Sequence, residues 1–260
     1  MTIYFVYATV FLFGLAAGSF VNVCIYRIPK GVSILAPRSA CPACGEALKP
    51  QELIPVISYI ALRGRCSRCR ARISILYPIV ELMCGLLWAA LFSRFSASFQ
   101  FAVYAPFCTV LLAVPFIDFR TMRIPNGLVV AALFPAAAAA VKFIAFSSGP
   151  ERFRSVYGSM DWSSPLLGLL PCAAFLLISI VSAAIGKGKA AIGMGDVKLL
   201  IPAGLALGLR QCLLAVFVAV TLGGAAGIIL LATGVKKRKD PIPFGPFLVA
   251  GIYAAFFLTV

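Results

Sequence analysis

The sequence predicts an all-α polytopic membrane protein, and three observations support this prediction. Hydrophobic residues make up 62% of the 260 residues and charged residues only 12%, whereas a soluble domain is about half apolar and about a quarter charged. The apolar residues form long runs that break at Gly, Pro and charged residues, unlike the alternation of transmembrane β-strands. Helices are then the remaining way to satisfy backbone polar groups in lipid.

The apolar runs predict about eight transmembrane helices. The first has neither the basic start nor the cleavage site of a signal peptide, so we expect it to be retained. Its Gly14-x-x-x-Gly18 pattern offers a small-residue face for close helix packing. The sixth is short for a crossing, which needs about 20 residues, so we expect it to begin inside the membrane or to cross only partly. The predicted spans are residues 3–26, 75–92, 99–117, 127–146, 165–185, 197–209, 212–233 and a last one that ends at 260.

The distribution of Lys and Arg predicts the orientation of the chain. Of the 23 basic residues, 17 lie in the segments that follow the first, third, fifth and seventh predicted spans. The positive-inside rule then makes these segments cytoplasmic and places both termini outside. The bilayer also accounts for the net charge of +15. We expect no nucleic-acid partner, because no nucleic-acid-binding module accompanies the basic residues. The sequence does not indicate an oligomeric state.

Three of the eight acidic residues, Glu81, Asp118 and Asp196, lie at or within the predicted spans. An ionised carboxylate deep in a bilayer costs a few kcal/mol. The presence of acidic residues at these positions therefore indicates a specific role. Asp118 ends the third span and Asp196 precedes the sixth, which puts both at the cytoplasmic face. Two neighbouring carboxyls can share a proton, one acting as base on a water and the other as acid toward a carbonyl. The alternative is that each carboxylate only stabilises the start of a helix.

Asp196 lies in the segment Gly193-Met194-Gly195-Asp196-Val197-Lys198-Leu199. The two glycines would let an extended peptide backbone approach the carboxylate, although loop flexibility or close packing would also explain them. Lys198 would either tune Asp196 or meet a lipid phosphate. With Glu81, for which helix packing is the alternative, Gly193, Gly195 and Lys198 are the candidate substrate-binding residues.

Four cysteines form two Cys-x-x-Cys pairs in the polar segment 27–74. They read Cys41-Pro42-Ala43-Cys44 and Cys66-Ser67-Arg68-Cys69. Paired motifs of this kind are typical of structural zinc sites, and a cytoplasmic location disfavours disulfides. The prediction is therefore a small zinc-binding loop, with redox-active pairs or free thiols as the alternatives.

Several motifs in their order along the chain resemble the type IV prepilin peptidases, membrane aspartic proteases with a Gly-x-Gly-Asp motif. Each motif alone is weak, but the complete series covers nearly the whole chain and is specific. The matching residues are Gly18-Ser19-Phe20-Val21-Asn22-Val23, Tyr26-Arg27-Ile28-Pro29, the two cysteine pairs, Ile54-Pro55-Val56, Arg63-Gly64-Arg65-Cys66, Ile73-Ser74, Tyr77-Pro78-Ile79-Val80-Glu81, Asp118, Ile124-Pro125, Gly193-Met194-Gly195-Asp196-Val197-Lys198 and Pro243-Phe244-Gly245-Pro246-Phe247-Leu248.

The resemblance implies a bifunctional enzyme of the bacterial inner membrane. Such enzymes cleave the short basic leader of prepilins and pseudopilins, which are membrane-spanning substrates, at the cytoplasmic face. Many then N-methylate the new N-terminus with S-adenosylmethionine. The resemblance makes Asp118 and Asp196 the catalytic residues, and the cysteine loop is typical of the bifunctional members. The methyl-donor site has no recognisable motif in this sequence.

The expected organisation is a first transmembrane helix (1–26), a cytoplasmic zinc-binding loop (27–74) and a transmembrane aspartic protease core (75–260), with periplasmic termini. Hydrolysis would use an aspartate-activated water, without a catalytic metal. A cleavage-only peptidase and an inactive scaffold are alternatives. A proton-coupled transporter, which also uses intramembrane carboxylates, would be expected to show inverted repeats, and the two halves of the sequence do not correspond convincingly.

Overall fold

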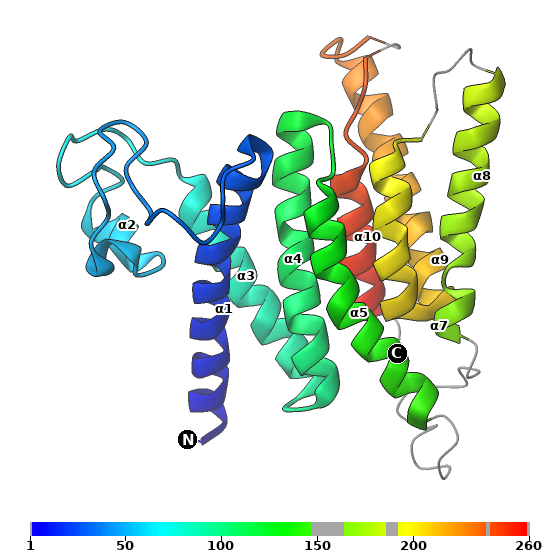
Figure 1. The fold of residues 1–260 in the computed structure, drawn as a ribbon, viewed down its shortest axis with the longest axis horizontal. Helices are drawn as coiled ribbons and strands as arrows, with labels where there is room; N and C mark the ends of the chain where they lie inside the picture. Colours follow the sequence, from blue (N-terminus) through cyan, green and yellow to red (C-terminus); the bar gives the residue numbers. More distant parts are fainter. Residues whose placement is uncertain (1, 147–163, 186–191, 238–239, 259–260) are drawn as a thin grey trace. The chain divides into compact units, whose positions relative to one another are not determined.

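The computed structural model describes residues 2–146, 164–185, 192–237 and 240–258 (Figure 1). Within these residues the chain is helical and has no β-strand, only two isolated β-bridges, which confirms the all-α prediction. The elements are α1 (Thr2–Arg27), η1 (Ile28–Lys30), η2 (Pro50–Leu53), α2 (Ile57–Ala61), α3 (Leu76–Phe95), α4 (Phe99–Thr121), α5 (Asn126–Phe146), α7 (Ser164–Leu167), α8 (Leu170–Ile185), α9 (Met194–Ala232) and α10 (Gly245–Leu258).

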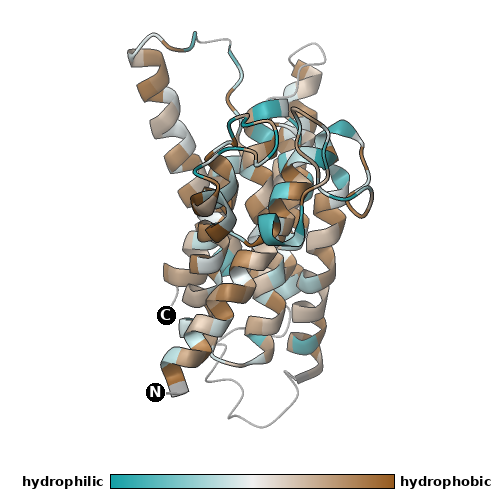
Figure 2. Ribbon diagram, turned by 90° about the vertical axis from the view of Figure 1, so that its left-hand side faces the viewer, coloured by the Kyte–Doolittle hydropathy of each residue, from teal (hydrophilic) through white to brown (hydrophobic). Residues whose placement is uncertain are grey.

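Among the described residues, six helices are long and apolar enough to cross a membrane, and α10 is a further apolar helix of 14 residues. The first five predicted spans correspond to α1, α3, α4, α5 and the segment Pro165–Ile185. The exact count of eight is not confirmed. The sixth and seventh predicted spans are the two helical parts of α9, which meet at the non-helical residue Gly208. Figure 2 shows that the helices are predominantly hydrophobic, whereas hydrophilic residues gather in the loop between α1 and α3.

Helix α9 bends at Gly208. It has 39 residues, which corresponds to roughly 58 Å of straight helix, about twice the thickness of a hydrocarbon core. Gly208 has φ 74°, a left-handed conformation that glycine adopts without steric cost. The boundary expected at residues 210–211 is therefore a kink two residues earlier, and the chain continues as helix on both sides of it.

The chain divides into two compact units, residues 1–113 and 114–260. In the first unit, α1 packs closely against α3. A Cβ atom on Gly14 would lie 2.8 Å from the Gly85 Cα, and one on Gly18 would lie 2.7 Å from the Glu81 Cα. The predicted small-residue face of α1 is thus confirmed, because these backbones approach to distances that any side chain would prevent.

In the second unit, α9 packs against α5, α7, α8 and α10 (Figure 1). Backbone contacts are again very close, since a Cβ on Gly204 would lie 2.0 Å from the Gly168 carbonyl oxygen. Fully buried side chains fill the remaining space, among them Ile117, Leu200 and Ile252. Packing of this density is the main attraction between helices in lipid, and here it holds α9 against α5, α7, α8 and α10.

Three of the segments that connect the predicted spans fall wholly or partly outside the described residues. They are the polar stretch 147–164, most of the glycine- and lysine-rich loop 186–195 and half of the basic run 236–239.

Candidate functional site

Asp118 lies in the last turn of α4 and is buried, with 5% of its surface exposed. Its Oδ2 atom accepts a hydrogen bond of 3.0 Å from the backbone N–H of Gly245, the first residue of α10. A helix N-terminus presents unpaired N–H groups and a partial positive charge. The start of α10 therefore orients this carboxylate and satisfies one of its oxygens.

Gly245 is a residue whose role sequence reasoning missed. A Cβ atom at this position would lie 2.7 Å from Asp118 Oδ2 and 3.3 Å from Val114 Cγ1, too close for a side chain without displacement of the carboxylate. The sequence contains one signal for it, a glycine between Phe244 and Pro246 immediately before an apolar helix. Its contact with Asp118 spans 127 positions of the chain, which no local pattern reveals.

Asp196 is the third residue of α9, and Gly193 is the N-cap of that helix. The Asp196 backbone N–H donates to the Gly193 carbonyl over 3.1 Å. The side chain is half-buried, and its carboxyl interacts electrostatically with that of Asp118. The second unit therefore brings together the two aspartates that the sequence singled out, one from the end of α4 and one from the start of α9.

The other predicted residues near Asp196 have different surroundings. Gly193 is exposed, and a Cβ atom on it would lie 3.0 Å from Asp196 Oδ2. Gly195 is half-buried and lies against Ile124. A Cβ atom on Gly195 would lie only 3.1 Å from the Ile124 Cβ. Lys198 Nζ donates to Asn126 Oδ1 over 3.1 Å, which links α9 to the first residue of α5.

Glu81 belongs to the first unit, and its contacts lie within that unit. The residue is on α3 with 7% of its surface exposed. Its Oε2 atom accepts a 2.8 Å hydrogen bond from the backbone N–H of Val56, and Ser19 and Asn22 of α1 also hydrogen-bond to the carboxyl. Asn22 in addition donates to the Tyr77 carbonyl over 3.0 Å. Glu81 therefore joins α1, α3 and the cysteine loop.

The four cysteines predicted to bind a metal converge in the loop between α1 and α3. The sulfur atoms of Cys41, Cys44, Cys66 and Cys69 all lie within 4.8 Å of one another, and those of Cys41 and Cys69 are 3.8 Å apart. A tetrahedral site with Zn–S distances of about 2.3 Å has sulfurs about 3.8 Å apart. The donor set thus fits a four-thiolate metal site.

Both cysteine pairs adopt the same local fold. The N–H of Gly45 donates to the Cys41 carbonyl, and in the second pair the N–H of Arg70 donates to the Cys66 carbonyl. Each pair is framed by an antiparallel bridge, Ala40 with Ala47 and Arg65 with Arg72. We call these two turns the knuckles, residues 40–47 and 65–72.

The knuckle backbone also favours the thiolate form that a metal requires. The backbone N–H groups of Cys44 and Ala43 donate to the Cys41 sulfur and lower the pKa of this thiol to about 7. Hydrogen bonds to a charged form stabilise it. The first knuckle therefore favours the thiolate of Cys41 chiefly through its backbone.

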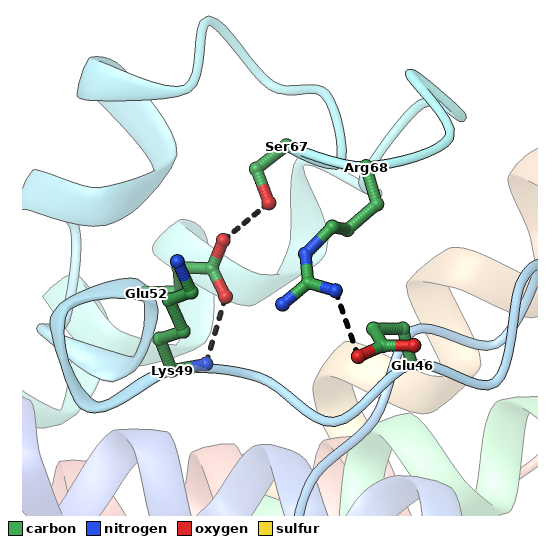
Figure 3. Close-up of polar contacts among 5 residues, drawn as sticks. All are labelled: Glu46, Lys49, Glu52, Ser67 and Arg68. Atoms are coloured by element: carbon green, nitrogen blue, oxygen red, sulfur yellow. Dashed lines mark hydrogen bonds and ion pairs between the residues drawn. The ribbon is translucent and has the colours of Figure 1, made fainter.

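Polar side chains connect the two halves of the loop, as Figure 3 shows. Arg68 forms an ion pair of 2.7 Å with Glu46 across the knuckles. Ser67 donates to Glu52, which also accepts a 2.8 Å hydrogen bond from the Lys49 backbone N–H. The Ser67 hydroxyl, followed by the Lys49 N–H, holds the pKa of Glu52 below its usual value. The ion pair is exposed and contributes little stability by itself.

Comparison with known proteins assigns the family. Residues 12–95 match the bacterial peptidase A24 N-terminal domain, and residues 105–228 match the type IV leader peptidase family. A prepilin leader peptidase/N-methyltransferase of Bacillus subtilis is 35% identical over 95% of this chain and 92% of its own length. The chain belongs to the type IV leader peptidase family.

Two further relatives carry the same name. The protein of Burkholderia pseudomallei (strain K96243) is 32% identical over 94% of this chain and 82% of its own length. The protein of Pseudomonas aeruginosa is 32% identical over 95% of this chain and 88% of its own length. No solved structure matches. In this leader peptidase family member, both aspartates fall within the peptidase match, whereas Glu81 and the four cysteines fall within the N-terminal match.

Proposed function

We propose that this chain removes the leader peptides of type IV prepilins and pseudopilins at the cytoplasmic face of the bacterial inner membrane, with Asp118 and Asp196 as its catalytic pair. The proposal depends chiefly on one observation, the electrostatic interaction between the two carboxyls, which lie at the end of α4 and the start of α9. Family membership supports the reaction. The positive-inside count of the sequence supports the cytoplasmic face and periplasmic termini.

In the proposed mechanism, a water between the two carboxyls attacks the scissile carbonyl. One carboxylate takes a proton from the water, and the other, protonated, donates to the carbonyl oxygen. The tetrahedral intermediate then collapses and the leaving amine receives a proton, so no covalent enzyme intermediate forms. The Gly245 N–H already occupies Asp118 Oδ2, which leaves the other oxygen of Asp118 for water or the shared proton.

The start of α9 is the proposed contact for the substrate backbone. Gly193 is exposed beside the Asp196 carboxylate and carries no side chain, so an extended peptide can approach this carboxylate closely. Gly195 lets α9 start against Ile124. Lys198 and its partner Asn126 would lie at the rim of the site. Because the substrate is itself a membrane-spanning helix, it would enter laterally from the lipid.

The second proposed activity is methylation of the N-terminus that cleavage exposes. The substrate amine, once it has lost a proton, would accept the electrophilic methyl group that S-adenosylmethionine supplies, as the sulfur–methyl bond breaks and the thioether product is released. The names of the relatives support this activity. The chain would then comprise the first helix (1–26), the cysteine loop (27–74) as a folded accessory element, and the protease core (75–260).

We further propose that Cys41, Cys44, Cys66 and Cys69 hold a structural zinc ion. Four thiolates fill the tetrahedral positions of zinc and leave none for a reacting water. The loop has few buried apolar side chains, namely Cys41 and Cys66. A metal would therefore supply folding free energy that a core of this size lacks.

Mass spectrometry of a pilin co-expressed with this chain tests both activities. Loss of the leader together with one methyl increment on the new N-terminus is the expected result. An unprocessed prepilin would contradict the proposed function. A cleaved but unmethylated pilin would favour the cleavage-only alternative.

A further inference from the structure

The segment around α2 exposes an apolar patch in the loop between α1 and α3. Leu53, Ile54, Ile57 and Ile60 have 43%, 45%, 61% and 68% of their surface exposed. Ile57 and Ile60 are three positions apart on α2 and so lie on one face of that helix. Single exposed apolar residues are ordinary on a protein surface, but a cluster of four within eight positions marks an interaction surface.

A hydrogen bond fixes the depth of this patch relative to the first unit's membrane-spanning helices. Val56, the N-cap of α2, donates its N–H to Glu81. Glu81 is the sixth residue of α3, a helix long and apolar enough to cross a membrane, and thus lies roughly 7 Å from its start at 1.5 Å per residue. The beginning of α2 is therefore level with the first turns of α3, as Figure 1 also shows.

The backbone conformation of Val56 also indicates that its hydrogen bond to the Glu81 carboxylate is a fixed feature of the fold. Val56 has φ 61°, a conformation that is sterically costly for a β-branched residue. Such strain persists only where the surroundings determine the conformation, and here the buried Glu81 carboxylate receives the N–H. Glu81 thus holds α2 at the boundary of the apolar helices and prevents it from extending into solvent.

The charge around the patch indicates what covers it. The segment 27–74 carries nine Lys or Arg and two Glu, and both Glu are engaged, Glu46 with Arg68 and Glu52 with Ser67. The arginines that follow α2 have exposed side chains; they are Arg63, Arg65, Arg70 and Arg72. An apolar patch at membrane depth that is flanked by basic residues matches the acyl boundary and phosphates of an anionic bilayer.

We propose that residues 53–72 form a membrane-docking element, in which the four apolar side chains enter the bilayer interface and the four arginines bind phosphates of anionic lipids. The proposal is independent of the proposed peptidase activity. It assigns Glu81 a positioning role, since its hydrogen bond to Val56 sets the depth of α2.

The test is photo-cross-linking of the full-length protein in lipid nanodiscs. A benzophenone side chain replaces Ile60, and a second variant carries it at Leu86, a residue of α3 that is 62% exposed, as the positive control. A third carries it at Ala43, an exposed residue of the first knuckle. We expect lipid adducts at positions 60 and 86, with a several-fold higher yield at 60 in phosphatidylglycerol than in phosphatidylcholine, and little adduct at 43.

A second pair of variants tests the arginines. Replacing Arg63, Arg65, Arg70 and Arg72 by Gln should lower the position-60 yield in phosphatidylglycerol to that in phosphatidylcholine, while the four Lys replacements should preserve it. Metal content and proteolytic resistance of the loop show that each variant is folded. The proposal is wrong if position 60 yields no lipid adduct while position 86 does. A protein–protein adduct at position 60 would also overturn the proposal. So would a lipid-adduct yield at position 60 that is the same in phosphatidylglycerol and in phosphatidylcholine.

Discussion

The cysteine loop and the aspartate site are built from contacts of different range along the chain. In the loop, the ligands of each knuckle are three positions apart, and the hydrogen bonds within each knuckle span four or five positions. At the aspartate site, Asp118 meets Gly245 across 127 positions, and dense helix packing holds both. The loop should therefore depend on the proposed metal and on its turns, whereas the proposed catalytic pair should depend on how α4, α9 and α10 pack. Disturbing one region should leave the other largely intact.

The largest effect is expected from removing the metal. Structural zinc contributes an apparent 10–16 kcal/mol to the folding of small thiolate sites, so Cys66→Ser should release the metal and unfold the knuckles. The measurements are metal content and limited proteolysis of residues 28–75. Leader cleavage should retain a larger share of its rate than methylation. The buried Cys212 provides the control, because Cys212→Ser should leave the metal content unchanged.

The converse experiment disturbs the aspartate site alone. Gly245→Ala forces a methyl group to within 2.7 Å of Asp118 Oδ2, and displacement of a catalytic group by about 1 Å can reduce the rate about 100-fold. We expect cleavage to fall by about this factor with the metal content unchanged. In the control Gly224→Ala, the new methyl group meets no atom within 4 Å. Equal cleavage by the two variants would contradict the role given to Gly245.

These two experiments probe features that sequence reasoning reached to different degrees. The paired cysteines were predicted with their ligand role, because Cys-x-x-Cys spacing is a local property that one turn of backbone satisfies. The helices followed from apolar runs, and both aspartates followed from carboxylates placed at run boundaries. Their catalytic role stays a prediction.

Other features were beyond the sequence because they depend on tertiary contacts. The kink at Gly208 joins two predicted spans, and a glycine in an apolar run gives no indication that its φ is positive. The hydrogen bond from the Val56 N–H to Glu81 and that from the Gly245 N–H to Asp118 each join distant segments. Residue spacing alone indicates neither partner.

A smaller effect should distinguish the two knuckles from each other. Gly45 has φ 74°, and the equivalent residue of the second knuckle, Arg70, has φ 60°. A non-glycine residue in this region costs about 1 kcal/mol. Arg70→Gly should therefore stabilise the loop and Gly45→Ala destabilise it, each by about 1 kcal/mol, as measured by resistance to proteolysis or to chelator. If Arg70→Gly destabilised the loop and Gly45→Ala stabilised it, side-chain contacts and not backbone conformation would determine the stability at these two positions.

The smallest effect concerns the pH dependence of the loop. The pKa of Glu52 is lowered in the folded protein, so its contribution to stability is present above its unfolded pKa of about 4.3 and is lost as pH falls through the lower folded value. Ser67→Ala removes the main cause of this shift. The stability difference between wild type and Ser67→Ala should therefore shrink on acidification below about pH 4.3. A difference that is constant with pH would contradict this assignment.

The central claim is that Asp118 and Asp196 act together on one peptide bond. The most direct measurement is the initial rate of leader removal from a purified prepilin by the wild type and by Asp118→Asn and Asp196→Asn. Each Asn variant keeps the shape of the side chain but loses its ability to exchange a proton. The account predicts that each variant loses about 10²- to 10⁴-fold in rate and that the double variant is little worse than either single one. Leader removal at the wild-type rate by either single variant would contradict it.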